Sequence, residues 1–317
     1  MDWRRRAGAL LILLAGACGG AGNTPPQIGT IRQPLTTRRI VIYGDSRPAV
    51  TGESFFLGRT DPVKERRLVI EQIARERPDL VIHSGDLVTR GSSEGAWTLW
   101  DEAHRPILDA KIPFFPALGN HEYTGENKEA LGYFNQRFPA LGGCRWYSVQ
   151  SGPLFFVILD SNFDDLGHRA VKRQDEWYRK TLRDAEGDRE VRAVIVVCHH
   201  PPYSNSAIHG ASEEVQRRFA EPAASCPKFR FFVAGHVHNY ERFLIEGRPF
   251  VVSGGGGAPR TPVLTSKFRT DPIYQGPEFR PFHYLLVTVG EAKATVEVMM
   301  LQPNDSWRSG DRFEFTW

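Results

Sequence analysis

Five short, almost continuously apolar runs recur along this chain, and each ends at a polar side chain that can bind a metal. Runs rich in Val, Ile and Phe are typical of strands that are covered on both faces. The runs and their ends read VIYGD, VIHSGD, PALGNH, VVCHH and VAGHVH. Ligands of α/β proteins bind at the carboxyl ends of strands, so we expect these five ends to form one site.

Helical segments separate several of the runs. Residues 61–77, 94–110 and 170–185 are expected to form helices. From residue 249 onward the pattern changes to strands and turns, with a hairpin expected over residues 288–298. The residues alone therefore predict one α/β domain with a mixed sheet that ends in antiparallel strands, and they contain no internal repeat.

The amino terminus has the features of an export signal. Three arginines precede an apolar stretch over residues 7–14, and small residues lead to Cys18. We therefore expect a signal peptide over residues 1–17, a Gly- and Pro-rich tether over residues 18–37 and a single domain over residues 38–317. The letters LLAGAC resemble a bacterial lipobox, which predicts an exported lipoprotein anchored to the membrane through Cys18, in the periplasm or at the cell surface. Plain secretion is the alternative.

The charge of the chain argues against one class of partner. The 317 residues carry a formal net charge of +3. A nucleic-acid-binding protein usually shows a larger basic excess, so no nucleic-acid binding is expected.

Cysteine usage leaves one question open. Export permits disulfides. Cys198 lies in an apolar strand and is expected to be a buried free thiol. Cys144 and Cys226 both flank loops and are the expected pair, although three positions allow three single pairings.

The polar residues at the strand ends suit a metal centre. Carboxylates, an amide and imidazoles favour Fe, Mn or Zn, and the absence of clustered cysteines argues against a structural zinc site. Two carboxylates with several histidines are enough for two ions that share a bridging carboxylate. Each motif taken alone is also compatible with ordinary turn chemistry.

The chain resembles the calcineurin-like metallophosphoesterase superfamily over about residues 38–298, because all five blocks occur in that superfamily's order. The segments HHPPYSNSAIHG and GHVHNYER are similar to those of its purple acid phosphatase branch. This resemblance implies an α/β fold in which a sandwich of two β-sheets is flanked by helices. It also implies a metal-dependent hydrolase of phosphate esters.

The resemblance further implies two metal ions held by six side chains: Asp45, Asp86, Asn120, His199, His236 and His238. Asp45 and His238 would bind the first ion. Asp86 would bridge both ions, and the remaining three would bind the second. His121 and His209 would contact the phosphate or protonate the leaving oxygen, since an imidazole titrates near working pH.

Two positions depart from the superfamily pattern. Arg47 stands where a histidine ligand is usual, and Thr89 stands where the purple enzymes carry a tyrosine. The first ion therefore keeps three of the expected side chains, and no tyrosinate colour is expected. Arg47 lies two residues beyond Asp45, so an extended segment would point both the same way. We expect Arg47 to clamp the substrate phosphate, the alternative being a solvent-facing arginine.

The sequence thus predicts a phosphatase that hydrolyses monoesters by attack of a metal-bound hydroxide at a dinuclear site. One alternative is a phosphodiesterase acting on nucleotides or lipid headgroups. Another is a metal-binding lipoprotein with impaired turnover. Loops 47–60 and 257–281 are expected to set specificity. Asp160 either orients a ligand histidine or belongs to a turn, and Gly254–Gly257 either approach the site or form a tight turn.

Overall fold

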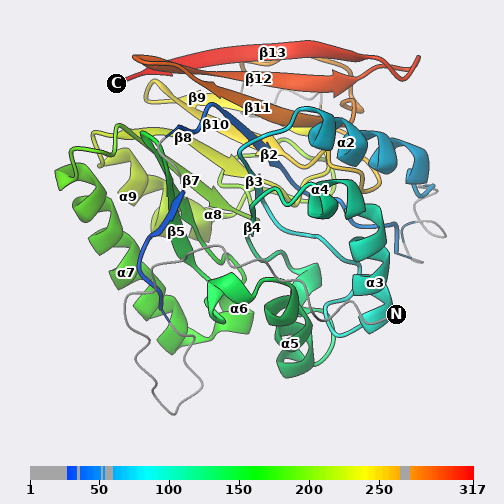
Figure 1. The fold of residues 1–317 in the computed structure, drawn as a ribbon, viewed down its shortest axis with the longest axis horizontal. Helices are drawn as coiled ribbons and strands as arrows, with labels where there is room; N and C mark the ends of the chain where they lie inside the picture. Colours follow the sequence, from blue (N-terminus) through cyan, green and yellow to red (C-terminus); the bar gives the residue numbers. More distant parts are fainter. Residues whose placement is uncertain (1–26, 34–35, 51–52, 54–59, 265–271) are drawn as a thin grey trace.

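The computed structural model describes residues 27–33, 36–50, 53, 60–264 and 272–317 (Figure 1). The predicted signal peptide, Cys18 and most of the tether lie outside the described residues, and so do parts of both specificity loops. Within the described ranges, no helix is both long and apolar enough to cross a membrane. The boundaries proposed for the signal peptide and the tether remain predictions.

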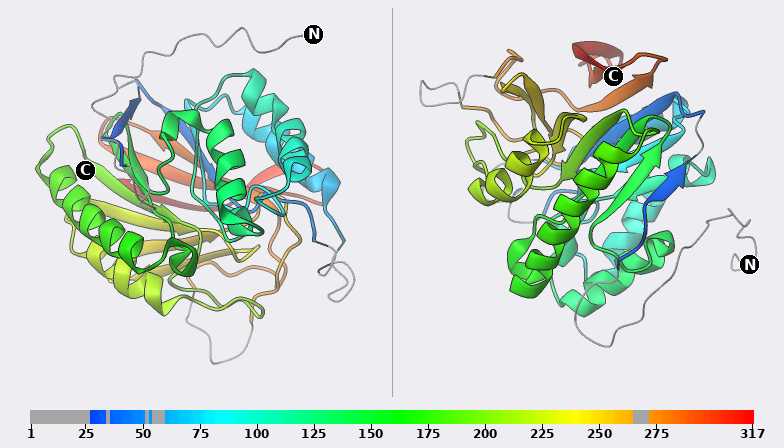
Figure 2. Two further views of the ribbon diagram at one scale, coloured as in Figure 1. Left: turned by 90° about the horizontal axis from the view of Figure 1, so that it is seen from below. Right: turned by 90° about the vertical axis from the view of Figure 1, so that its left-hand side faces the viewer.

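Two mixed sheets pack face to face, with helices on both outer sides (Figures 1 and 2). The seven-stranded sheet contains, in spatial order, β1 (Ile31–Gln33), β5 (Tyr147–Ser151), β6 (Leu154–Ile158), β7 (Ala193–Cys198), β8 (Phe229–Ala234), β10 (Arg248–Ser253) and β9 (Tyr240–Ile245). The six-stranded sheet contains β13 (Trp307–Thr316), β12 (Lys293–Leu301), β11 (His283–Val289), β2 (Arg39–Tyr43), β3 (Leu80–His83) and β4 (Phe114–Pro116).

The helices and short helical turns connect these strands. They are α2 (Val63–Arg75), α3 (Glu94–Ala103), α4 (Arg105–Asp109), η2 (His121–Tyr123), α5 (Asn127–Arg137), η3 (Pro139–Leu141), α6 (Phe163–Leu166), α7 (His168–Gly187), α8 (Glu213–Val215), η4 (Gln216–Ala220) and α9 (Glu221–Ala224). Helix α7 covers the outer face of the seven-stranded sheet, and α2 covers the outer face of the six-stranded sheet.

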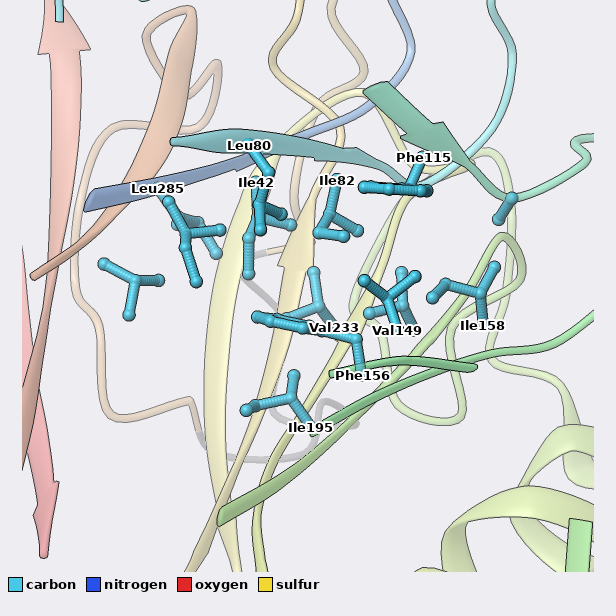
Figure 3. Close-up of a cluster of buried hydrophobic side chains, with 14 of the residues drawn as sticks. Ile42, Leu80, Ile82, Phe115, Val149, Phe156, Ile158, Ile195, Val233 and Leu285 are labelled. Carbon is cyan, nitrogen blue, oxygen red and sulfur yellow. The ribbon is translucent and has the colours of Figure 1, made fainter. Parts of the chain in front are cut away.

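Strand β2 shows why the apolar runs are continuous. Successive side chains of a strand point to opposite faces of its sheet. Ile40 and Ile42 enter the core between the two sheets, whereas Val41 and Tyr43 enter the core beneath α2. Figure 3 shows the inter-sheet core, where side chains of the two sheets interdigitate. Both faces of the strand are dry, so both must be apolar.

Most expected elements are present, and the predicted two-sheet sandwich is confirmed. The helix expected over residues 94–110 is divided in two at His104. Pro106 explains the break, because proline lacks an N–H and clashes with the preceding helical turn. The hairpin expected over residues 288–298 appears between β11 and β12, and β5 and β6 form another antiparallel pair.

The expected disulfide is wrong. Cys144, Cys198 and Cys226 are all buried free thiols in the described structure. Cys226 packs in the core beneath α7, whereas Cys144 lies in the turn after η3. Although Cys144 and Cys226 both flank loops, the fold does not bring their thiols together.

Candidate metal centre

The predicted ligands meet where both sheets present their carboxyl ends. The parallel strands β2, β3 and β4 of the six-stranded sheet lead to Asp45, Asp86 and Asn120. The parallel strands β7 and β8 of the other sheet lead to His199 and to the pair His236 and His238. The site is therefore assembled from the two halves of the sandwich.

A left-handed backbone turns three of these residues into the site. Asp45, Asp86 and His236 have φ values of 58°, 59° and 67°. Such values are uncommon for residues other than glycine and mark positions that the surrounding structure must hold. Here the backbone N–H of His236 donates to both Asp45 oxygens, at 2.9 and 3.0 Å.

Glycine is required beside this turn. A methyl group on Gly254 would lie 2.8 Å from Asp45 Oδ2 and 2.5 Å from the Val237 carbonyl oxygen. A methyl group on Gly235 would lie 2.4 Å from the same Asp45 oxygen. The sequence left two interpretations of the glycine-rich segment, a close approach to the site or a tight turn. Gly254 approaches the site closely.

The position predicted for the second ion is compact. Asn120 Oδ1 lies 3.0 Å from both His199 Nε2 and His236 Nδ1. The two imidazole nitrogens are 3.2 Å apart, and His199 Nε2 is 3.3 Å from Asp86 Oδ1. All four predicted side chains therefore point at one place.

The position predicted for the first ion is also formed. Asp45, Asp86 and His238 are each at most 2% exposed, and their ligand atoms lie within 4.8 Å of one another. His238 Nε2 is 3.5 Å from Asp45 Oδ1. Thr89 contributes its carbonyl oxygen, which lies 2.8 Å from His121 Nδ1.

Backbone carbonyls fix which imidazole nitrogens carry protons. His199 Nδ1 lies 2.9 Å from the Ser84 carbonyl oxygen, and His238 Nδ1 lies 2.7 Å from that of Pro259. A carbonyl accepts only, so each Nδ1 donates and each Nε2 of the neutral ring keeps its lone pair. Those lone pairs face carboxylate and amide oxygens, which is an arrangement that fits a cation.

Burial also keeps these imidazoles in the neutral form that binds a cation. It lowers the pKa of His199 and His236, and together with the nearby Arg47 charge it lowers the pKa of His238 to about 3. These rings are therefore neutral near pH 7 and available as ligands. Burial and the neighbouring Asp86 raise the pKa of Asp45 well above its usual range. A cation between the two carboxylates would relieve that repulsion.

Asp86 behaves differently from Asp45. Burial acts to raise its pKa, but His199, His121 and Arg47 outweigh burial and hold it well below the usual value. Asp86 therefore stays ionised, as a bridging ligand must be. Its Oδ1 accepts from the His121 backbone N–H at 3.1 Å, which ties the β3 and β4 ends together.

Glu122 is the main structural residue that the sequence analysis missed. Its buried carboxylate accepts four backbone N–H groups, from Gly119, Asp86, Leu87 and Val88 at 2.7, 2.8, 2.8 and 3.2 Å. Burial and Asp86 raise its pKa to about 8, against the effect of these donors. The carboxylate holds both ligand-bearing loops. In the sequence, this role was indicated by the position of Glu122 directly after Asn120 and His121.

Three further histidines lie around the ligand cluster. His121 is partly exposed, and its Nε2 is 3.9 Å from Asp86 Oδ2. The ring of His209 lies 4.7 Å from that of His236, measured between centroids. His200, which was not a predicted ligand, lies 4.4 Å from the His236 ring and forms a metal-capable group with His199 and His236. The doubled histidine in the sequence was its only signal.

Arg47 is buried, so the solvent-facing alternative is wrong. The residue is 3% exposed. Its two terminal nitrogens donate to the Glu53 carboxylate, each at 2.8 Å, and its Nε lies 3.5 Å from Asp86 Oδ2. The left-handed backbone at Asp45 means that this segment is not the extended one expected, and the terminal nitrogens of Arg47 are already bound to a carboxylate.

Asp160 lies near the site without orienting a ligand histidine. It accepts from the Tyr123 hydroxyl, and from the backbone and side-chain nitrogens of Asn162 at 3.0 and 2.8 Å. The turn interpretation therefore describes it.

Comparisons with known proteins agree with this geometry. Residues 39–240 match the family model described as calcineurin-like phosphoesterase. The chain is 26% identical over 252 residues to purple acid phosphatase 23 of Arabidopsis thaliana, covering 67% of this chain and 54% of that protein. It is 26% identical over 275 residues to a nucleotide pyrophosphatase/phosphodiesterase of Hordeum vulgare, covering 72% of each. The alignment thus spans about half the length of the first relative.

A solved structure supports the fold. A purple acid phosphatase from yellow lupin, Lupinus luteus, superposes with a TM-score of 0.64 at 20% identity, covering 92% of this chain and 56% of that one. The family match covers more than half of the chain and includes every predicted ligand strand. This chain therefore belongs to the calcineurin-like phosphoesterase family.

Proposed function

We propose that this protein hydrolyses phosphate monoesters at a two-metal site formed by Asp45, Asp86, Asn120 and three histidines. The observation that supports this proposal most strongly is the convergence of metal-capable atoms at the second position. There, His199 Nε2, His236 Nδ1 and Asn120 Oδ1 lie within 3.2 Å of one another. Fe, Mn and Zn all suit this mixture of nitrogen and oxygen ligands.

Bound ions would supply the usual chemistry of such centres, acidifying a water and neutralising phosphate charge. The protein's own residues then have separate tasks. His121 Nδ1–H donates to the Thr89 carbonyl, so Nε2 faces the site, and when the ring is protonated at both nitrogens Nε2–H can deliver a proton to the leaving oxygen. His209, beside His236, is proposed to donate a hydrogen bond to the phosphate. No serine or cysteine nucleophile is assigned, so direct displacement is proposed.

The first experiment separates esterase activity from metal binding alone. The metal-stripped protein, reloaded with Mn²⁺, Zn²⁺ or Fe²⁺, is assayed with p-nitrophenyl phosphate and with bis(p-nitrophenyl) phosphate. His121→Ala should lower kcat on the preferred ester by about 10²- to 10⁴-fold while metal content stays unchanged, as expected on removing a general acid. If neither ester is hydrolysed with any of the ions, the proposal fails. The alternative of a metal-binding protein with impaired turnover is then favoured.

A diesterase is the second candidate, because one relative is named a nucleotide pyrophosphatase/phosphodiesterase. The same assay distinguishes the two functions. A higher kcat/KM for the bis ester than for the monoester would replace the monoesterase proposal with this one.

Export and lipid attachment at Cys18 are proposed from the amino-terminal sequence alone. Labelling of the full chain with palmitate in a bacterial host, with Cys18→Ser as the comparison, tests the anchor. Equal label on both forms would contradict it.

A further inference from the structure

The two oxygens of Asp86 face different surroundings. Oδ1 is directed toward the second metal position, 3.3 Å from His199 Nε2. Oδ2 has a guanidinium beside it, with Arg47 Nε at 3.5 Å. The oxygen left for the first ion therefore already has a positive charge next to it.

The orientation of this guanidinium is fixed. Both terminal nitrogens of Arg47 donate to Glu53, and one of them also donates to the Pro48 carbonyl oxygen at 2.9 Å. The Arg47 side chain is 4% exposed. Its Nε is a buried nitrogen without a hydrogen-bond partner among the described residues, and it points at Asp86. Glu53 thus holds Arg47 in place and partly cancels its charge.

The influence of this pair reaches the other ligands of the first position. The Arg47 charge acts on both Asp45 and His238, and the Glu53 charge acts on His238. The Arg47 charge also acts on His199 at the second position. However, Arg47 Nε lies beside Asp86 Oδ2, whereas the Asp86 oxygen directed toward the second position, Oδ1, faces His199 Nε2. The two positions therefore differ in their electrostatic surroundings even though they share Asp86.

We propose that the Arg47–Glu53 ion pair sets the affinity of the first metal position and makes it the weaker of the two. This inference rests on the metal-dependent function proposed above and assigns a role to residues that lie beside the ligand set. Arg47 repels an ion at the first position, whereas Glu53 attracts it. At such short range a unit charge changes the binding of a divalent ion by well over tenfold, even at a high effective dielectric constant.

Isothermal titration calorimetry of the metal-stripped protein with Mn²⁺, at fixed ionic strength, tests the proposal. The wild type should bind two ions with Kd values that differ by at least about tenfold. Arg47→Met should tighten the weaker step by about tenfold or more, and Glu53→Gln should weaken it by a similar factor. The stronger step should stay within about threefold of the wild type in both variants.

Controls separate charge from packing. Arg242 and Asp311 form a similar bidentate pair elsewhere, with bonds of 2.8 and 2.9 Å, so Arg242→Met should leave both Mn²⁺ affinities unchanged. Arg47→Lys keeps the charge and should keep the weaker step weak. If Arg47→Met does not fold, Glu53→Gln and Arg47→Lys still test the idea.

Two outcomes overturn the inference. One is equal Mn²⁺ affinities in the wild type. The other is Arg47→Met with unchanged Mn²⁺ affinities, and a raised KM for p-nitrophenyl phosphate would then identify Arg47 as the phosphate clamp expected from the sequence. The ester assay tests the proposed function separately. If the Mn²⁺ affinities change as described but no ester is hydrolysed, the proposed function fails and this inference stands.

Discussion

Replacement of Glu122 by glutamine should destabilise the whole domain. Oε2 accepts from Gly119 and Asp86, and Oε1 accepts from Leu87 and Val88. In glutamine, an amide nitrogen without a lone pair replaces one of these oxygens. Either orientation of the amide therefore leaves two backbone N–H groups buried without an acceptor, whether the native carboxyl group is ionised or not.

The expected magnitude follows from those two lost bonds. A buried, unsatisfied donor costs about 1–3 kcal/mol, so Glu122→Gln should lower the free energy of unfolding by about 2–6 kcal/mol. At about 2–4 °C per kcal/mol for a domain of this size, Tm should fall by roughly 5–20 °C. Urea and thermal unfolding of the metal-free protein measure both quantities.

A matched substitution distinguishes the four-bond arrangement from a general Glu→Gln effect. Glu126 is exposed at the start of α5 and accepts one backbone N–H, from Glu129 at 2.9 Å. Glu126→Gln should cost less than about 1 kcal/mol. An unfolding free energy for Glu122→Gln within about 0.5 kcal/mol of the wild type would refute the reasoning, since the four N–H groups would then have other acceptors.

Two further predictions concern pH and metal content. Burial raises the pKa of Asp160 to about 6, so the folded state binds an extra proton between about pH 4 and pH 6, and the stability due to this group is lost as pH rises through 6. Relative to the wild type, Asp160→Asn should therefore gain about 3 kcal/mol of unfolding free energy between pH 3.5 and pH 7.5, measured with urea; a constant difference would contradict this. His238→Ala leaves Asp45 and Asp86 as the remaining predicted side chains of the first position, so it should abolish the weaker Mn²⁺-binding step in calorimetry and keep the stronger one. Retention of both steps would show that His238 is not a ligand.

The strands and the ligand cluster were predictable because both depend on short-range patterns. A buried strand needs apolar side chains on both faces, so its residues reveal its position, as Ile40–Tyr43 show. The same pattern does not say what covers each face. The residues alone therefore suggested one mixed sheet, and the family resemblance was needed to divide it into two.

Features that depend on distant partners were not predictable. Nothing in the local sequence indicated that the Glu53 carboxylate would bind both terminal nitrogens of Arg47. The four bonds of Glu122 depend on how the β3 and β4 loops approach each other. Cys144 and Cys226 both flank loops, yet the packing of the chain separates them.

The division of the ligands between the two sheets couples ion binding to the docking of the sandwich halves. Asp45, Asp86 and Asn120 end strands of one sheet, and the three histidines end strands of the other. An ion bound to both groups acts as a non-covalent cross-link that the unfolded chain lacks. By mass action, an ion at 100 times its Kd would add about 2.7 kcal/mol to the free energy of unfolding. In a metal-poor medium the same chain would hold its halves together by the apolar core and by direct hydrogen bonds such as that from the His236 N–H to Asp45, so its resistance to heat and proteolysis would follow the supply of metal.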